Sequence, residues 1–221
     1  MSATAPPDET LRPALEALAA RDPDVAHWYP RCGLPPVRRR PPGFGSLLHI
    51  MCAQQVSAAS ARAIVGRLDA AARPLTPRSF LALDDAALRA IGFSSSKVRH
   101  GRALAVDVLA ERIDIDGLAG MDDMAAVAHL VQVKGIGPWT AEIYLMSALD
   151  RPDVWPADDL AVQTAAQRLK DLPVRPSRAQ MIELAEPWRP YRSAAARLLW
   201  HIYSHPGVPG NSPGGLPEGE A

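Results

Sequence analysis

The segment Val131-Gln-Val-Lys-Gly-Ile-Gly-Pro-Trp-Thr-Ala-Glu142 decides the fold of this 221-residue chain. An apolar run that ends at Leu130 leads into it, and a second apolar run continues to Leu149. Two glycines on either side of one apolar residue suit a sharp turn between helices, because glycine tolerates conformations and close approaches that other residues do not. Pro138 fits the first position of the second helix, with Gly137 as its N-cap. The segment therefore predicts a tight hairpin between two helices.

The start of the second helix in this hairpin is a candidate anion site. A helix N-terminus presents unpaired backbone N–H groups and the positive end of the helix dipole. We predict that the anion is a DNA phosphate, held by Lys134, Gly135, Gly137 and Thr140. A plain corner between two packed helices would use the same residues, so the hairpin alone leaves both interpretations open.

The composition of the chain favours closely packed helices. Hydrophobic residues make up 48% and aromatic residues only 5%. The length allows one large domain or two small ones, with enough residues to bury a core. We find no apolar run long enough to span a membrane and no secretion signal. We therefore expect a cytoplasmic protein without membrane contact, and we expect it to be a monomer.

The net charge and the number of cysteines limit which partners and cofactors the chain can bind. The formal net charge is zero, which predicts few phosphate contacts and a shallow salt dependence of any DNA binding. Cys32 and Cys52 are too few to ligate an iron–sulfur cluster, so we expect none. Pairing of these two cysteines stays open, although a reducing setting is the default.

Capping residues mark most of the expected helix boundaries. Ser46, Ser57, Asp84, Ser94 and Asp122 each precede an apolar-periodic run, as N-caps do. We expect helices over residues 11–20, 47–54, 58–68, 96–111, 161–169, 178–186 and 193–203, two more that open at Thr76-Pro77 and at Asp84, and a left-handed C-cap at Gly92. The buried face of the helix over 96–111 should carry Val98, Ala105 and Leu109.

Three segments of the chain differ in organisation. We expect residues 1–43 to form an N-terminal extension with a disordered start, a short helix and a Pro/Arg-rich loop. Residues 44–205 should form the core in two helical lobes, and the Gly/Pro-rich residues 206–221 a flexible tail. Arg38-Arg39-Arg40 in the loop is either a solvated surface run or a phosphate clamp.

Four motifs, in order along residues 44–205, resemble the helix-hairpin-helix DNA glycosylases. Besides the hairpin, these are Ala53-Gln-Gln-Val-Ser57, Val154-Trp-Pro-Ala-Asp-Asp-Leu-Ala-Val162, and Trp188-Arg-Pro-Tyr-Arg-Ser193 with Leu199-Trp-His201. The last resembles the 3-methyladenine DNA glycosylase II (AlkA-like) branch. The resemblance implies an all-α, two-lobed fold whose central cleft takes double-stranded DNA with alkylated bases. That branch can carry an N-terminal sheet domain, which we expect to be absent or vestigial here because no repeated strand signals precede the match.

The resemblance implies that Asp159 is the catalytic residue of a DNA repair hydrolase. The family pattern puts this aspartate three residues before an apolar helical position, which is Val162 here. A carboxylate stabilises the positive charge that develops on the sugar and can orient water. Alkylated purines such as 3-methyladenine and 7-methylguanine are cationic leaving groups, so no partner acid is required. Asp158 would be the supporting or capping residue, although either aspartate could simply cap the helix.

The resemblance also assigns a pocket for the flipped-out base. Trp139 and Trp200 should sandwich a cationic purine, with Ile143 and Phe44 nearby, although some relatives have tyrosine at the position of Ile143. Trp139 stands where lyase-competent members have a nucleophilic lysine, so we expect monofunctional hydrolysis that leaves an abasic site. Tryptophans on helices are more often core residues, as we expect for Trp155 and Trp188.

The remaining site residues expected from the resemblance contact DNA or a cation. Gln55 should enter the DNA stack as a wedge, next to Gln54, where a polar helix corner is the alternative. Lys97 and Arg99 form either a DNA-flanking patch or a solvated face. The backbone carbonyls of Val131, Val133 and Ile136 match a site for Na⁺ or K⁺, and no other cofactor is expected. Two rival functions stay open: a non-catalytic DNA-binding hairpin module, and a glycosylase for a different damaged or mismatched base.

Overall fold

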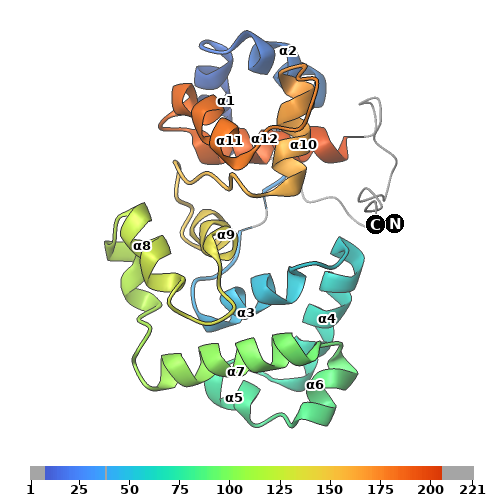
Figure 1. Cartoon of the computed structure of the whole chain (residues 1–221), viewed down its shortest axis with the longest axis vertical. Helices are drawn as coiled ribbons and strands as arrows, with labels where there is room; N and C mark the ends of the chain where they lie inside the picture. Colours follow the sequence, from blue (N-terminus) through green and yellow to red (C-terminus); the bar gives the residue numbers. More distant parts are fainter. Residues whose placement is uncertain (1–7, 38, 206–221) are drawn as a thin grey trace. The chain divides into compact units, whose positions relative to one another are not determined.

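The computed structural model describes residues 8–37 and 39–205. Within these ranges the chain forms helices and no strands (Figure 1). The all-α expectation is confirmed for this part of the chain. The predicted tail over residues 206–221 lies outside the described residues. The chain divides into a terminal unit, residues 1–39 with 151–221, and a middle unit, residues 40–150. Among the helices described, none is long and apolar enough to cross a membrane.

The terminal unit joins the two ends of the chain in one helical core. Its helices are η1 (Glu9–Leu11), α1 (Arg12–Ala19), α2 (Pro23–Cys32), α10 (Leu160–Leu169), α11 (Arg178–Ala185), η3 (Glu186–Trp188) and α12 (Arg192–Ser204). α12 packs against α10, α1 and α2. Leu15, Leu18 and Leu198 are almost fully buried where these helices meet. Residues from both chain ends therefore share the core that carries α10.

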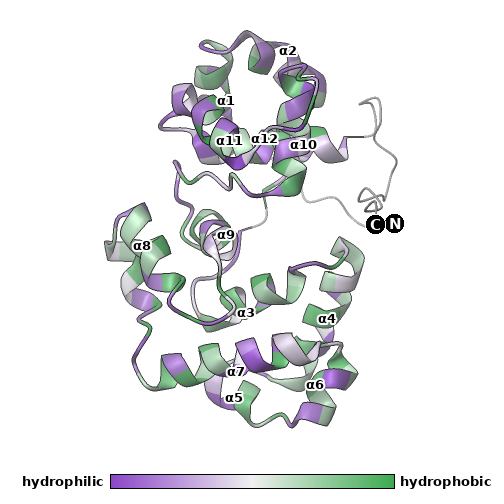
Figure 2. Ribbon diagram, viewed as in Figure 1, coloured by the Kyte–Doolittle hydropathy of each residue, from purple (hydrophilic) through white to green (hydrophobic). Residues whose placement is uncertain are grey.

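The middle unit is built around one buried helix. Its helices are α3 (Phe44–Ala53), α4 (Ala58–Ala71), α5 (Pro77–Leu81), α6 (Asp85–Ile91), α7 (Ser95–Leu109), η2 (Asp116–Gly120), α8 (Asp123–Leu130) and α9 (Pro138–Ala148). α3 is hydrophobic along most of its length and packs against α4, α7 and α9 (Figure 2). This places the C-terminal end of α3 close to the start of α9.

Most predicted caps are confirmed. Ser57, Thr76, Asp84, Ser94 and Asp122 each accept a hydrogen bond from a backbone N–H in the first turn of the following helix. Gly92 is left-handed, with φ 111°. These boundaries were predictable because a cap depends on residues only two or three positions away.

Three expectations about the middle unit and the first residues are corrected. Ser46 does not cap α3, which begins at Phe44; its hydroxyl donates to the carbonyl of Pro41 at 2.6 Å. Leu109 is 42% exposed rather than on the buried face of α7. Glu9 and Thr10, in the start expected to be disordered, belong to the 3₁₀ helix Glu9–Leu11.

The N-terminal residues differ most from expectation. The expected loop begins at Pro30, but residues 30–32 belong to α2, which is capped by Asp22 and tolerates the proline near its end. Residues 8–37 and Arg39 also belong with the C-terminal helices instead of forming a separate extension. Arg39 is bound within this unit, since it pairs with Asp8 and donates a hydrogen bond to the Thr10 hydroxyl at 2.9 Å.

Candidate DNA-binding and catalytic site

The hairpin between α8 and α9 has the predicted form. Gly137 is the N-cap of α9, with φ −93° and ψ 175°, and Pro138 is the first helical residue. In the turn, Val133 N–H donates to the carbonyl of Leu130 at 3.1 Å, and Ile136 N–H donates to the carbonyl of Val133 at 3.0 Å. Val133 and Ile136 are 1% and 4% exposed, so their side chains anchor the turn to the core of the middle unit.

The two glycines of the hairpin serve different purposes. Gly135 has φ 95°, and a Cβ on it would lie 2.4 Å from Cγ of His100, a residue of α7. Gly135 is therefore required both by its backbone conformation and by the close approach of α7. A Cβ on Gly137 would meet no atom within 4 Å beyond its chain neighbours, so the N-terminus of α9 is open there.

The predicted DNA-binding residues of the hairpin are not all accessible. Lys134 and Gly137 are exposed, as a phosphate contact needs. Thr140 is 1% exposed, and its hydroxyl accepts a hydrogen bond from Gln54 Nε2 at 2.6 Å. The hydroxyl of Thr140 faces the inside of the middle unit. The expected contact of this hydroxyl with DNA therefore does not fit the structure.

The corner after α3 is tied to both α7 and the hairpin. Lys97 Nζ donates to the carbonyls of Cys52 at 2.7 Å and Gln54 at 2.9 Å. Lys97 therefore does not extend from the surface as a DNA-flanking patch would require, and burial lowers its pKa. Gln55 is exposed and has φ 55°, so the expected wedge residue projects from a constrained backbone. Arg99 is exposed on α7.

Asp159 is the N-cap of α10 and is 9% exposed. Its Oδ1 accepts two hydrogen bonds, from Val162 N–H at 3.0 Å and from Trp200 Nε1 at 3.0 Å. Asp158, expected to be the supporting or capping residue, does not cap α10; it is exposed and pairs with Arg178 at 2.9 Å. The structure thus separates the two adjacent carboxylates, one held at a helix start by an indole and one at the surface.

The tryptophans also separate into two groups. Trp155 and Trp188 are 6% and 1% exposed and pack edge to face, so the expectation that they belong to the core is confirmed. Trp200 is only partly buried, and its indole N–H bonds to Asp159. Trp139 is partly exposed in the first turn of α9, on the same face as Ile143 one turn later.

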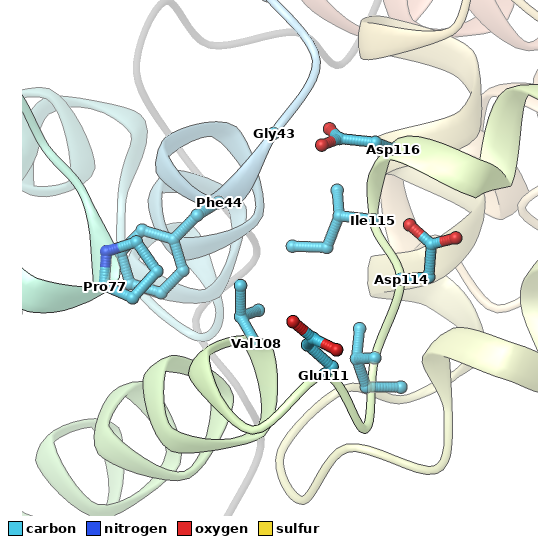
Figure 3. Close-up of a pocket in the computed structure, with 9 residues that line it drawn as sticks. Gly43, Phe44, Pro77, Val108, Glu111, Asp114, Ile115 and Asp116 are labelled. Atoms are coloured by element: carbon cyan, nitrogen blue, oxygen red, sulfur yellow. The ribbon is translucent and has the colours of Figure 1, made fainter.

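A cavity of about 570 Å³ in the middle unit involves only one of the predicted pocket residues. Phe44 lines one side of this cavity, and Ile115, Asp114 and Asp116 lie across from it (Figure 3). Glu111 also lines the cavity. Trp139 and Ile143 do not line this cavity, so it does not show the expected grouping of Phe44 with these two residues.

The start of α3 is held by a contact that local sequence does not signal. The buried hydroxyl of Tyr144, on α9, accepts a hydrogen bond from Gly43 N–H at 2.8 Å. Gly43 is the N-cap of α3 and has no side chain with which to cap it. The tyrosine therefore fixes the position of α3, and with it Phe44, against α9.

Side chains suited to a metal ion do not gather in the residues that the structure describes. The carbonyl of Val133, one of those expected to bind Na⁺ or K⁺ together with Val131 and Ile136, accepts the N–H of Ile136. A carbonyl oxygen has a second lone pair, so this bond leaves the cation site a prediction. Cys32 and Cys52 are free thiols, and burial raises the pKa of Cys52 to about 12.

Known proteins share this fold and much of its sequence. The family described as HhH-GPD superfamily base excision DNA repair protein matches residues 48–190. DNA-3-methyladenine glycosylase 1 of Schizosaccharomyces pombe is 31% identical over 161 residues, 71% of each chain. DNA-3-methyladenine glycosylase 2 of Escherichia coli is 29% identical over 72% of this chain, which spans only 54% of that relative. The solved structure of S. pombe 3-methyladenine DNA glycosylase Mag1 in complex with abasic DNA has a TM-score of 0.81 and 28% identity, covering 86% of this chain and 95% of the other.

Proposed function

Because the chain belongs to the HhH-GPD superfamily of base excision DNA repair proteins, we propose that it removes alkylated purines from double-stranded DNA. The proposed reaction is hydrolysis of the N-glycosidic bond of a flipped-out base such as 3-methyladenine or 7-methylguanine. The names of the similar proteins from S. pombe and E. coli support this substrate class. The observation that carries the proposal is Asp159, held at the start of α10 by Val162 and Trp200.

The proposed chemistry needs one well-placed carboxylate. Cleavage of the bond builds positive charge on the sugar, as in other glycoside hydrolyses. A fixed carboxylate stabilises this charge most effectively when it does not have to reorient during the reaction. The two donors on Oδ1 of Asp159 fix its orientation. An alkylated purine leaves as a neutral base, so the reaction proceeds without a partner acid.

The decisive experiment compares the two adjacent aspartates. Asp159→Asn keeps an oxygen that can accept from Val162 N–H and Trp200, and asparagine is a favoured N-cap, so the fold should be retained. Excision from methylated duplex DNA should fall at least about 100-fold, the scale expected for loss of a main electrostatic contact. Asp158→Asn removes the same charge from the neighbouring, exposed position and should keep full activity.

Two outcomes would contradict the assignment. Near-full activity of Asp159→Asn would show that another group stabilises the sugar. A wild-type protein that binds duplex DNA but releases no base from it would favour a non-catalytic DNA-binding module. Assay of a panel of damaged and mismatched bases separates the proposed alkylpurine activity from that of a glycosylase for another lesion.

We also propose that the enzyme is monofunctional. Trp139 stands in the hairpin where lyase-competent members of the superfamily have lysine, and its side chain has no nucleophile. Water should displace the base and leave an intact abasic strand. Treatment with borohydride during turnover should trap no covalent protein–DNA adduct. An adduct on denaturing gel electrophoresis would contradict this prediction.

The remaining parts of the proposal concern the setting of the reaction. The exposed Lys134 and the open N-terminus of α9 at Gly137 support a phosphate contact by the hairpin. We propose that the protein acts as a cytoplasmic monomer, and that Na⁺ or K⁺ at the hairpin carbonyls is its only bound ion. Size-exclusion chromatography, and DNA binding compared in Na⁺, K⁺ and choline salts, test these points.

A further inference from the structure

The corner between α3 and α4 has a constrained backbone at its exposed tip. α3 ends at Ala53, Gln54 is extended, and Gln55 turns the chain with φ 55°. Residues other than glycine, asparagine and aspartate rarely adopt this left-handed conformation. A conformation of this kind persists when its surroundings determine it. The contacts on either side of Gln55 must therefore stabilise this conformation.

Lys97 braces the main chain of the corner. It lies in the first turn of α7, where Ser94 caps the helix and accepts from Lys97 N–H. From there its ammonium group reaches the carbonyls of Cys52 and Gln54, at 2.7 and 2.9 Å. Cys52 lies in the last turn of α3 and Gln54 is its C-cap, and the last C=O groups of a helix have no partner within it. A cation at this end also complements the helix dipole.

The side chain of Gln54 forms a second brace, towards the hairpin. Its Nε2 donates to the hydroxyl of Thr140 at 2.6 Å and, at the longer distance of 3.4 Å, to the carbonyl of Gly135. Thr140 is 1% exposed in the first turn of α9, so this acceptor is fixed. The corner and the hairpin are therefore joined, within one unit, through a hydrogen bond to a buried hydroxyl.

We propose that Lys97 and Thr140 are positioning residues that hold Gln55 in the conformation with which it enters the DNA stack. The inference rests on the proposed function. In this arrangement the hairpin binds the DNA backbone, the hydrogen bond from Gln54 to Thr140 sets the distance from the hairpin to the corner, and Lys97 stops the corner from relaxing. The two braces act on extrusion of the base from the duplex, and not on cleavage of the bond once the base is out.

The experiment separates base extrusion from bond cleavage. Single-turnover excision is measured on two duplexes with one 7-methylguanine, opposite cytosine in the first and opposite a tetrahydrofuran abasic analogue in the second. Unstacking is easier where the base has no pairing partner. Lys97→Met should lower the rate about tenfold on the first duplex and no more than about twofold on the second. An equal loss on both duplexes, or no loss, overturns the inference.

Thr140 variants keep the test valid if Lys97→Met fails to fold. Thr140→Val preserves the shape of the side chain and removes the acceptor for Gln54, so it should show the same selective loss. Thr140→Ser restores the hydroxyl and should restore the rate on the first duplex. Failure of serine to rescue a valine defect would assign that defect to packing and overturn the role of this hydroxyl.

A double-mutant cycle distinguishes positioning from general destabilisation. Gln55→Ala should also lower excision only on the cytosine-paired duplex. Adding Lys97→Met to Gln55→Ala should lower the rate little further, because both changes remove the same entry of Gln55 into the DNA stack. Full additivity of the two losses would overturn the inference.

Arg89→Met provides the matched control for charge. Arg89 is exposed on α6 of the same unit, so its replacement removes one positive charge at the surface. Both duplexes should be processed at the wild-type rate. A loss like that of Lys97→Met would assign the effect to net charge and overturn the inference. A wild-type protein that acts on neither duplex would overturn the proposed function and, with it, this inference.

Discussion

At the scale of single residues, the site depends on what holds one oxygen of Asp159. That oxygen accepts from a helix N-terminus and from the indole of Trp200, a residue expected to stack on the base. The indole N–H is a donor only, so its geometry fixes the carboxylate with respect to the ring. Trp200 therefore bonds to the proposed catalytic group itself.

Trp200→Phe keeps an aromatic face but removes the donor to Asp159. A hydrogen bond to a charged group contributes about 1.5–3 kcal/mol, so excision should fall about tenfold or more. Single-turnover excision rates of the variant and the wild-type protein check this expectation.

The matched control for Trp200→Phe is Trp28→Phe. Trp28 is a partly exposed residue of α2 in the same unit, and its replacement should leave the excision rate unchanged. A wild-type rate in Trp200→Phe would contradict the role given to the indole N–H.

At the scale of secondary structure elements, the hairpin shows how two chemically identical residues can differ in role. Gly135 is confined by its left-handed backbone and by His100, whereas Gly137 caps α9 without a close neighbour. Local sequence predicts a turn at both positions, but only the packing of α7 against the turn separates them.

Gly135→Ala should destabilise the protein more than Gly137→Ala. A left-handed conformation costs an alanine about 1–2 kcal/mol, and the clash with His100 adds to this. Alanine at an N-cap is unfavourable by up to about 1 kcal/mol, which bounds the effect at Gly137. Urea unfolding monitored by circular dichroism measures both free energies.

Because a Cβ on residue 135 would also lie 2.6 Å from Cβ of His100, the double variant His100→Gly with Gly135→Ala, compared with His100→Gly alone, separates the two causes at the hairpin. In the His100→Gly background, Gly135→Ala should lose only the stability that the backbone conformation costs. Equal stability of the two single glycine variants would contradict the assigned roles.

At the scale of the whole molecule, the terminal unit depends on a contact between distant parts of the chain. Asp22 caps α2 and is 8% exposed. Its carboxylate accepts from Lys170 Nζ at 2.7 Å and from Trp188 Nε1 at 2.7 Å. The N-terminal helices are thereby joined to the end of α10 and to η3, which helps to form the core on which Asp159 rests.

Lys170→Met should lower the free energy of unfolding by about 3 kcal/mol, because it leaves the buried Asp22 carboxylate without its main partner. Arg12→Met breaks an exposed pair with Glu9 and should change the same quantity much less, because solvent screens this pair. Denaturant unfolding measures both. Similar losses of unfolding free energy in the two variants would show that the buried Asp22 carboxylate does not depend on Lys170.

The same contact predicts acid sensitivity. Burial raises the pKa of Asp22, but hydrogen bonds from Lys170 and Trp188 outweigh it, so the pKa is lowered overall. A carboxylate with a lowered pKa in the folded state contributes stability above its unfolded pKa, and this is lost as pH falls through the folded value. Unfolding free energy should therefore decline below about pH 4, and less steeply in Lys170→Met. A parallel decline in both proteins would contradict this.

Features that depend on neighbours along the chain followed from the residues alone. These include the caps at Ser57 and Asp122, the hairpin with Gly137 before Pro138, and the all-α class. Each depends on groups within a few positions, whose geometry the local backbone sets. The resemblance of four ordered motifs also led to the superfamily that the family match confirms.

Contacts between distant residues required the folded chain. The bonds from Lys97 to Cys52, from Trp200 to Asp159 and from Lys170 to Asp22 join residues 45, 41 and 148 positions apart. No local pattern encodes such partners, because they depend on how whole helices pack. For this reason local patterns allow either Asp158 or Asp159 as the cap of α10 and allow Lys97 on a DNA-facing surface, and only the tertiary structure decides each.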